Sequence, residues 1–134
     1  HYPLRRQRQM CIRDRRIGDS PVIGAGTYAD NNSCAVSCTG HGEYFIRHAV
    51  AFDVCARYKY LKESVEKAAD YIIHTELNTN AGNGGLIAVD KLGNIAMPYN
   101  SGGMFRGFLY KEKGSPEIKK GCGIGKKIVV VGEK

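Results

Sequence analysis

The segment RIGDSPVIGAGTYADNNSCAVSCTGHG, residues 16–42, is the most informative part of this chain. It opens with Arg16 and Asp19, passes through a glycine-rich turn and a short apolar segment, and ends at Thr39-Gly40-His41-Gly42. A guanidinium fork matches a carboxylate, and a carboxylate matches an ammonium group. Arg16 and Asp19 therefore suit a zwitterionic substrate, although an isolated pair with this spacing is more often a surface ion pair.

The far end of the stretch suits an oxyanion. A threonine at the end of a strand, followed by glycine at the start of a helix, can direct its hydroxyl group and the next backbone N–H at one oxygen atom. Backbone N–H groups at a helix start also carry partial positive charge. Gly40 and Gly42 let a substrate approach the backbone closely. Thr39 and Gly40 are therefore candidate oxyanion donors, with an ordinary helix N-cap as the alternative role of Thr39.

The rest of the chain predicts an α+β fold, with a layer of helices on an antiparallel sheet. Apolar residues at helical spacing predict helices over residues 43–62 and 63–77. Their expected buried faces are Phe45, Ala49, Phe52 and Ala56 in the first, and Val65, Ala68, Ala69, Ile72 and Ile73 in the second. Strands are predicted at residues 34–38, 86–89, 95–98 and 104–110, and residues 90–94 form a hairpin turn between the second and third of them. Residues 16–33 and 78–85 are expected to be loops and turns, and residues 111–134 are left without a predicted structure.

The blocks GDSP, GAGTYAD and TGHGE resemble the β-subunit of the plant-type asparaginases, also called isoaspartyl peptidases, and the likeness covers residues 16 to 108. The resemblance implies part of a four-layer αββα sandwich of the N-terminal-nucleophile (Ntn) hydrolase fold. An α-subunit and the start of the β-subunit would complete it, in an (αβ)2 assembly. It also implies an amidohydrolase that cleaves the side-chain amide of L-asparagine and β-aspartyl dipeptides. Glycosylasparaginases share the three blocks, whereas GNGGLIAVDKLGNIAMPYNSGGMFRG resembles the asparaginase branch more closely.

The same resemblance implies a role for each candidate residue. Arg16 binds the α-carboxylate of the substrate, Asp19 binds its α-ammonium group, and the Gly42 carbonyl is a second contact to that ammonium. The Thr39 hydroxyl and the Gly40 N–H form the oxyanion hole. The nucleophile is an N-terminal Thr, freed by self-cleavage, whose own α-amino group accepts the proton. No cofactor and no metal ion is expected.

The first fifteen residues stand apart from the rest. Residues 5–15, RRQRQMCIRDR, resemble letter for letter one reading frame of a transposon-type sequencing adapter. We therefore expect residues 1–15 to be a non-native segment and residues 16–134 to be part of a β-subunit. No Thr occurs in residues 1–26, so the chain as given is expected to be inactive for want of its nucleophile.

The formal net charge of +7 also depends on this segment, because residues 1–15 contribute +4 and leave +3 for the rest. A non-enzymatic basic protein that binds nucleic acid or membranes is the alternative of another class, and it depends almost wholly on residues 1–15. No apolar run approaches the ~20 residues of a transmembrane helix. The partners expected are therefore small substrates and the remaining subunit parts.

The cysteines outside the first segment lack CxxC pairs and histidines at ligand spacing, which argues against zinc. They are Cys34, Cys38, Cys55 and Cys122. Cys34 and Cys38 are expected to be small buried apolar residues, and nothing demands an oxidising compartment. Reduced thiols favour the cytoplasm, with the periplasm or lysosome as the location if the glycosylasparaginase interpretation holds.

Overall fold

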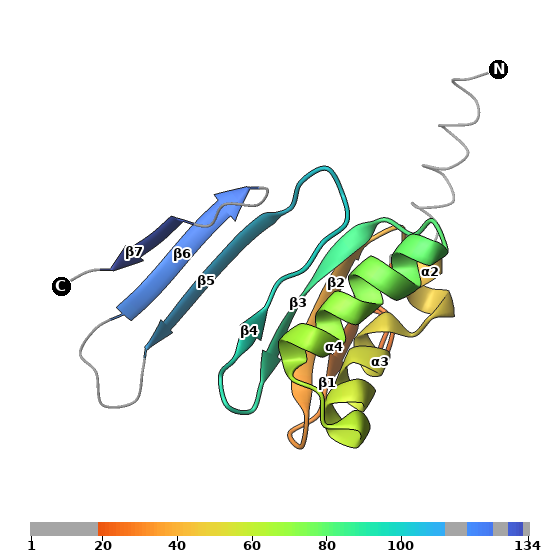
Figure 1. Cartoon of the computed structure of the whole chain (residues 1–134), viewed down its shortest axis with the longest axis horizontal. Helices are drawn as coiled ribbons and strands as arrows, with labels where there is room; N and C mark the ends of the chain where they lie inside the picture. Colours follow the sequence, from red (N-terminus) through yellow and green to blue (C-terminus); the bar gives the residue numbers. More distant parts are fainter. Residues whose placement is uncertain (1–18, 112–117, 125–128, 133–134) are drawn as a thin grey trace.

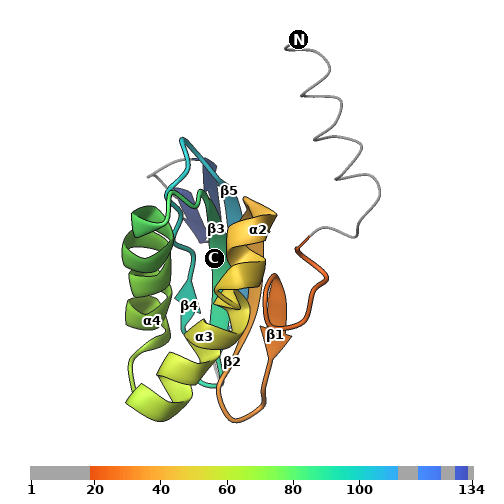
Figure 2. The same cartoon turned by 90° about the vertical axis from the view of Figure 1, so that its right-hand side faces the viewer.

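A four-stranded antiparallel sheet, covered on one face by helices, forms the body of the molecule (Figure 1 and Figure 2). The computed structural model describes residues 19–111, 118–124 and 129–132. The strands lie in the order β1 (Thr27–Ala29), β2 (Cys34–Gly40), β3 (Gly84–Asp90) and β4 (Ile95–Ala96). All neighbouring strands are antiparallel. The predicted α+β class is therefore confirmed, and β2 runs two residues further than expected.

The helices between β2 and β3 form one layer on the sheet (Figure 2). The first helical stretch comprises α2 (Gly42–Arg47), α3 (Val50–Ala56) and the π-helical segment η1 (Arg57–Leu61). The second comprises α4 (Val65–Tyr71) and the π-helical segment η2 (Ile72–Leu77). Ser64 is the N-cap of α4, and its side chain accepts a hydrogen bond of 3.3 Å from the Lys67 N–H. The second helix therefore starts at Val65, two residues later than predicted.

The prediction of one continuous helix over residues 43–62 was wrong, because the helix is broken at Ala49. Ala49 has φ 45° and ψ 48°, a left-handed conformation that ends a right-handed helix. The interruption changes which residues face the sheet, so that Phe52 is 44% exposed. The buried residues of α3 are instead Val50, Ala51, Val54 and Cys55. The predicted face is therefore correct only at Phe45.

The second helical stretch is buried as predicted. Its five expected core residues are at most 1% exposed: Val65, Ala68, Ala69, Ile72 and Ile73. They pack in one hydrophobic core with every second residue of β2, whose side chains point toward the helices: Cys34, Val36 and Cys38. An unbroken helical period explains why the sequence identified this face correctly.

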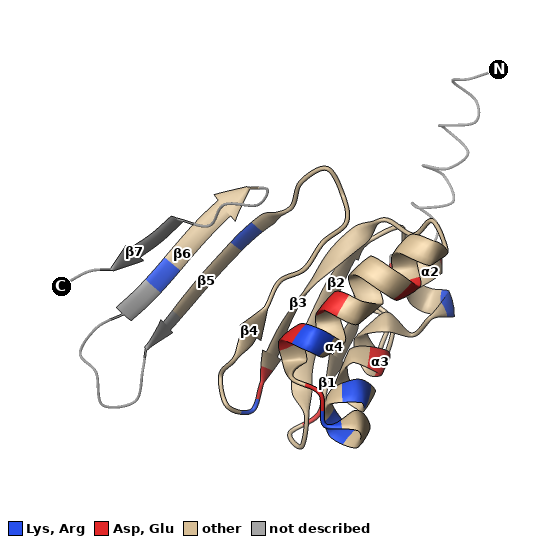
Figure 3. Ribbon diagram, viewed as in Figure 1, with Lys and Arg blue, Asp and Glu red and all other residues tan. Residues whose placement is uncertain are grey.

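The other face of the sheet is open and uncharged. Thr39 and Ser37 of β2 point to this face, as do Ile87 and Val89 of β3, which are 48% and 43% exposed. β1 and β2 carry no charged residue, and in β3 Asp90 stands at the very end (Figure 3). An uncharged sheet face with exposed aliphatic side chains normally packs against another layer.

A second antiparallel sheet has the order β5 (Phe105–Lys111), β6 (Ile118–Ile124) and β7 (Val129–Gly132). The strand predicted at residues 104–110 is confirmed as β5. Residues 111–134 had no predicted structure, and β1 was expected to be loop. β1 has three residues and β6 has two internal glycines. Such segments carry little strand signal and become strands through pairing with distant partners.

The hairpin predicted between β3 and β4 is present, and Asp90 organises its turn. One carboxylate oxygen of Asp90 accepts hydrogen bonds from the N–H groups of Leu92 (2.8 Å) and Asn94 (2.9 Å). The other oxygen accepts one from the Asn94 side-chain amide (2.8 Å). Gly93 has φ 89° in the middle of the turn, a conformation that glycine adopts without strain.

Replacing Asp90 with alanine should lower the free energy of unfolding by about 2 kcal/mol at pH 7, because several donors lose their acceptor. Burial tends to raise the pKa of Asp90, but the hydrogen bonds from Asn94, Leu92 and Gly93 outweigh it and hold the pKa below its usual value. The charged form is thus favoured by folding, so this stabilisation is present above about pH 4 and is lost as the pH falls through the folded-state pKa.

Urea unfolding across pH 3–7 measures the effect, with Asp70→Ala on the exposed side of α4 as the matched control. The control should show almost no change. The role of the carboxylate would be contradicted if wild type and Asp90→Ala differed by the same free energy of unfolding at pH 3 as at pH 7.

Candidate functional site

Four of the five predicted site residues meet at one end of the four-stranded sheet. Thr39 and Gly40 are the last residues of β2, and Gly42 is the first residue of α2. Asp19 lies against Gly42. Arg16 lies outside the described residues. The region is therefore formed by the strand end, the start of the helix and the loop before β1.

Asp19 is held in place through its backbone and lies almost fully buried, at 9% exposure. Its carbonyl accepts a hydrogen bond of 2.9 Å from the Val22 N–H, and Gly26 packs so closely on this carbonyl that no Cβ would fit. A Cβ on Gly42 would lie 2.6 Å from Asp19 Oδ1, so the carboxylate rests directly on the Gly42 backbone. Asp19 Oδ2 has no hydrogen-bond partner among the described residues. A buried carboxylate oxygen without a donor is costly and is suited to a cationic ligand group.

Cys38 precedes Thr39 in β2 and lies close enough to Asp19 for their charges to interact. Its N–H donates to the Gly26 carbonyl (2.7 Å), and its carbonyl accepts from the Ser20 hydroxyl (3.3 Å). Burial, followed by the negative charge of Asp19, raises the pKa of Cys38 to about 12. The thiol therefore stays protonated at neutral pH and is a structural group, since thiol nucleophiles react as thiolates.

The N–H of Gly40 points past the end of β1. The backbone N–H groups of successive strand residues point alternately to one neighbouring strand and to the other. The Cys38 N–H bonds toward β1 at Gly26, whereas the His41 N–H bonds toward β3 at Asn83 (2.8 Å). Gly40 therefore directs its N–H to the same side as Cys38, where β1 does not extend. Gly26 lies on this side of β2, and Asp19 packs against Gly26.

Thr39 does not cap the following helix. The N-cap position of α2 is occupied by His41, which makes no side-chain cap hydrogen bond. Thr39 belongs to β2, is exposed, and projects from the open face of the sheet, because its neighbour Cys38 projects into the core. The ordinary N-cap alternative is therefore wrong, and the hydroxyl group remains available for a ligand.

Gly84 supports the strand end and was missed by the sequence analysis, which placed residues 78–85 in a loop. Gly40 and Gly84 are direct partners in the ladder between β2 and β3. The Phe45 ring packs on both: a Cβ on Gly40 would lie 2.7 Å from Phe45 Cε2, and one on Gly84 would lie 2.8 Å from Phe45 Cζ. Glycine in a strand marks such a close approach, which is the signal that could have identified Gly84.

Asn100 holds the Gly84 segment in position and was also missed. Its side-chain oxygen accepts from the Gly84 N–H (2.8 Å), and its amide donates to the carbonyls of Gly82 (2.8 Å) and Ile73 (3.3 Å). Its backbone N–H donates to the Gly84 carbonyl (2.9 Å). One side chain thus joins η2, the loop before β3 and the chain after β4. A single polar residue after a Pro-Tyr pair carries no local signal for this role.

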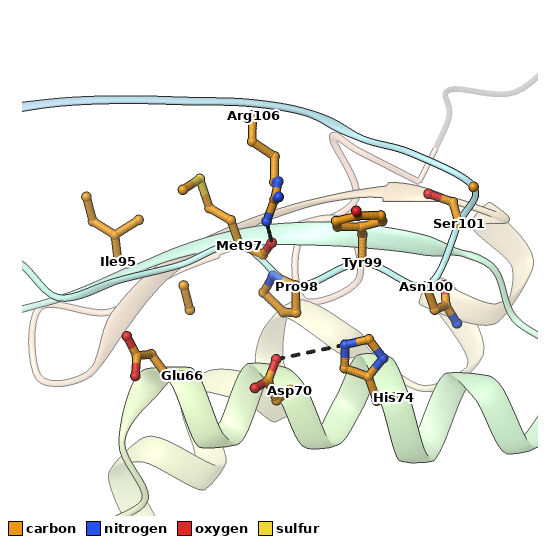
Figure 4. A pocket seen from close by; sticks show the side chains of 12 residues that line it. Glu66, Asp70, His74, Ile95, Met97, Pro98, Tyr99, Asn100, Ser101 and Arg106 are labelled. Carbon is orange, nitrogen blue, oxygen red and sulfur yellow. Dashed lines mark hydrogen bonds and ion pairs between the residues drawn. The ribbon is translucent and has the colours of Figure 1, made fainter. Parts of the chain in front are cut away.

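A hollow of about 640 Å³ lies elsewhere, between α4 and the chain that follows β4 (Figure 4). Its helical side presents Glu66, Asp70 and His74. On the other side the Arg106 guanidinium lies 4.8 Å from the Tyr99 ring centre and donates to the Met97 carbonyl (2.9 Å). None of the four site residues that the structure describes lines this hollow, so it is separate from the end of the sheet where they meet.

Among residues 19–111, 118–124 and 129–132, no three His, Cys, Asp or Glu side chains are grouped so that they could hold a metal ion. Within the same described ranges, every helix is too short or too polar to cross a bilayer.

Comparison with known proteins identifies the family. The asparaginase family profile matches residues 13–118. The chain is 50% identical to an isoaspartyl peptidase of Salmonella typhimurium over 95 residues, which cover 71% of this chain and 30% of that protein. It is 45% identical to an isoaspartyl peptidase of Escherichia coli over 109 residues (74% and 34%), and 42% identical to a human isoaspartyl peptidase/L-asparaginase over 89 residues (66% and 29%). It thus spans about a third of the length of these relatives. The resemblance inferred from the three sequence blocks is confirmed, and the chain belongs to the asparaginase family.

Proposed function

We propose that this chain supplies the substrate-binding and oxyanion residues of an amidohydrolase that cleaves the side-chain amide of L-asparagine and of β-aspartyl dipeptides. The observation that carries the proposal is the buried Asp19 carboxylate, which rests on Gly42 beside the outward-directed N–H of Gly40. Family membership supports the reaction type, since the relatives from Salmonella and Escherichia coli are named isoaspartyl peptidase.

The arrangement fits a small amino-acid substrate. Such a substrate carries its ammonium group, its carboxylate and its reacting carbonyl within a few bonds of one another, so their binding groups must be close together. In the proposal Asp19 and the Gly42 carbonyl bind the α-ammonium group, and Arg16 binds the α-carboxylate. The Thr39 hydroxyl and the Gly40 N–H donate to the side-chain carbonyl oxygen as it becomes negative in the tetrahedral intermediate.

The attacking group in this mechanism is the N-terminal Thr that the family resemblance predicts upstream of Arg16. Its hydroxyl attacks the side-chain carbonyl carbon, and its α-amino group accepts the hydroxyl proton and delivers it to the leaving ammonia or amine. Water then hydrolyses the acyl-enzyme, and the Thr hydroxyl is restored. The chemistry needs no thiol, which agrees with the protonated state of Cys38.

The proposal includes the αββα sandwich that the resemblance implies. The uncharged face bearing Thr39, Ile87 and Val89 is suited to pack on a second sheet. An α-subunit and the N-terminal part of the β-subunit would supply that sheet, and two such pairs would form the (αβ)2 assembly. The proposed oxyanion donors would then lie at the edge of the junction between the sheets.

An assay of the complete enzyme tests the proposal with three substrates: L-asparagine, a β-aspartyl dipeptide and GlcNAc-asparagine. We expect ammonia from the first and a free amino acid from the second, both in preference to cleavage of the third. Preference for GlcNAc-asparagine would assign the chain to the glycosylasparaginase branch. Absence of turnover with all three would contradict the proposed function and favour a non-enzymatic role.

The change Asp19→Asn tests the proposed ammonium contact. It should raise KM for asparagine about 10–100-fold, the effect of losing a hydrogen bond to a charged group. The change in kcat should be smaller, because the ammonium is bound in both the ground and the transition state. Asp70→Asn, the same change on the exposed side of α4, should leave KM unaltered.

Succinamic acid, which is asparagine without its α-amino group, provides the chemical control. Asp19→Asn should affect its turnover little, because the group that Asp19 binds is absent. Equal losses with asparagine and succinamic acid would show that Asp19 acts on the fold rather than on the ammonium.

A further inference from the structure

Two cysteines away from the proposed site face each other across the core. Cys34 is the first residue of β2 and Cys55 lies in the last turn of α3. They are 21 residues apart in the chain, yet their sulfur atoms lie 2.6 Å apart, and Cys55 Sγ lies 3.2 Å from the Cys34 carbonyl oxygen. Both are free thiols here and are 3% and 2% exposed. A disulfide bond is about 2.05 Å long, so the two sulfurs need to approach by only about half an ångström to reach bonding distance.

We propose that Cys34 and Cys55 form a reversible disulfide cross-link between β2 and α3. Cys38 is not an alternative partner for Cys34, because four strand residues at about 3.3 Å each separate the two by about 13 Å. A disulfide requires Cα atoms within about 7 Å. Cys122 lies on β6 in the second sheet and is exposed. Among the described cysteines, the geometry therefore selects the Cys34–Cys55 pair.

The oxidant in this proposal is a small-molecule disulfide of the glutathione type. Cys55 Sγ attacks one sulfur of the reagent, breaks its S–S bond and releases one thiol, which leaves a mixed disulfide on Cys55. Cys34 Sγ then attacks Cys55 Sγ and expels the second thiol. The two protons of the cysteines leave with the two released thiols, and two electrons pass from the pair to the reagent. A thiol reductant reverses both steps.

Cys55 is the sulfur that reacts first. A hollow of about 20 Å³, lined by Cys55, Lys59 and Tyr60 among others, approaches it from the surface, and Cys34 is absent from that lining. This space holds about one water molecule, so a larger reagent reaches Cys55 when the η1 end of the helix opens locally. The hydrogen bond from Cys34 lowers the pKa of Cys55, whereas hydrogen bonding to Cys55 and burial raise the pKa of Cys34. Both the hollow and the direction of the two pKa shifts favour Cys55 over Cys34 as the attacking sulfur.

The cross-link would join two elements that position the candidate site. The first N–H groups of α3 donate to the loop that follows Asp19: Ala51 to the Ala25 carbonyl (3.0 Å) and Phe52 to the Gly24 carbonyl (2.9 Å). β2 carries Thr39 and Gly40 at its other end. A bond between Cys34 and Cys55 would hold these two supports together without touching any proposed substrate contact. The oxidised chain should therefore be more stable and keep the same site geometry.

Peptide mapping of the full 134-residue chain tests the cross-link. The chain is incubated with oxidised or reduced glutathione, denatured, alkylated and cleaved with trypsin, without reductant. Cleavage after Arg47 separates residues 17–47, which contain Cys34 and Cys38, from residues 48–57, which contain Cys55. We expect these two peptides to be joined after oxidation, in the wild type and in Cys38→Ser, but not in Cys34→Ser.

Two results would overturn the proposal. One is separate alkylation of both peptides after oxidation. The other is a bond within residues 17–47 in place of the joined peptides, which is the short-loop product expected of an unfolded chain. A joined product that survives in Cys34→Ser would equally contradict it, because it would assign the bond to Cys38.

Thermal unfolding provides the second measurement. Oxidation should raise the midpoint by about 10 °C, the effect of closing a loop of this length, and dithiothreitol should reverse the rise. Cys34→Ser should show no difference between the oxidised and reduced conditions, whereas Cys38→Ser should keep it. A midpoint that does not respond to oxidation in the joined product would contradict a bond between the folded β2 and α3.

Discussion

Thr39→Ala is expected to lower kcat of the complete enzyme by about 10²–10³, the usual effect of removing one oxyanion donor. Thr39 projects from the open face at the end of β2, beside the N–H of Gly40, and its hydroxyl is not used to cap α2. The donor acts on negative charge that develops after the substrate is bound, so KM should change little. Ammonia release from asparagine measures both constants.

Ser37→Ala is the matched control, because Ser37 projects from the same face of β2 two residues earlier. It should leave kcat nearly unchanged. Thr39→Ser, which keeps the hydroxyl group, should retain most of the activity. A comparable loss of kcat in Ser37→Ala, or a change in KM alone in Thr39→Ala, would remove Thr39 from the oxyanion hole.

Gly84→Ala is expected to destabilise the fold by about 3 kcal/mol or more, because the added methyl group has no space. A Cβ at this position would clash with the Thr39 carbonyl and would lie 2.8 Å from both Gly40 Cα and Phe45 Cζ. The two backbone contacts belong to the strand end that carries the proposed oxyanion donors. The activity of the variant should therefore fall by a larger factor than the amount of folded protein does.

Gly102→Ala is the control for Gly84→Ala, since a Cβ there would meet no atom within 4 Å. Urea unfolding should show little change for this control. Adding Phe45→Leu to Gly84→Ala would relieve the contact with the ring but not the contacts with the backbone, so it should not restore stability. Equal stability of Gly84→Ala and Gly102→Ala would contradict the close contact between Gly84 and the end of β2.

The sequence predicted the second helix and the β3–β4 hairpin well, and the reason is local in both cases. The apolar positions of α4 and η2 recur without interruption, so one face is defined by the period alone. The hairpin turn is organised by Asp90, Gly93 and Asn94, all within five residues. Where the chain departs from a regular period, as at Ala49, the same reasoning assigned the wrong face to the following helix.

The site was predicted in the same uneven way. Asp19, Thr39, Gly40 and Gly42 were identified from residue type and from the resemblance to the asparaginases, and the structure brings them to one end of the sheet. The roles assigned to them, and to Arg16, stay predictions. Gly84 and Asn100 were missed, because each acts through a backbone contact with a segment 16 or more residues away.

Sequence patterns alone were enough to predict the family, the α+β class, the buried face of the second helix and the residue types available for binding an amino acid. These features depend on the spacing of apolar residues, on turn residues and on short motifs. Each such signal lies within a short continuous segment of the chain. The three-dimensional fold was needed to show that Asp19 rests on Gly42, that Gly40 pairs with Gly84, and that Cys34 meets Cys55. Such contacts depend on the path of the whole chain, because residues far apart in sequence become neighbours only when the strands pair and the helices cover them.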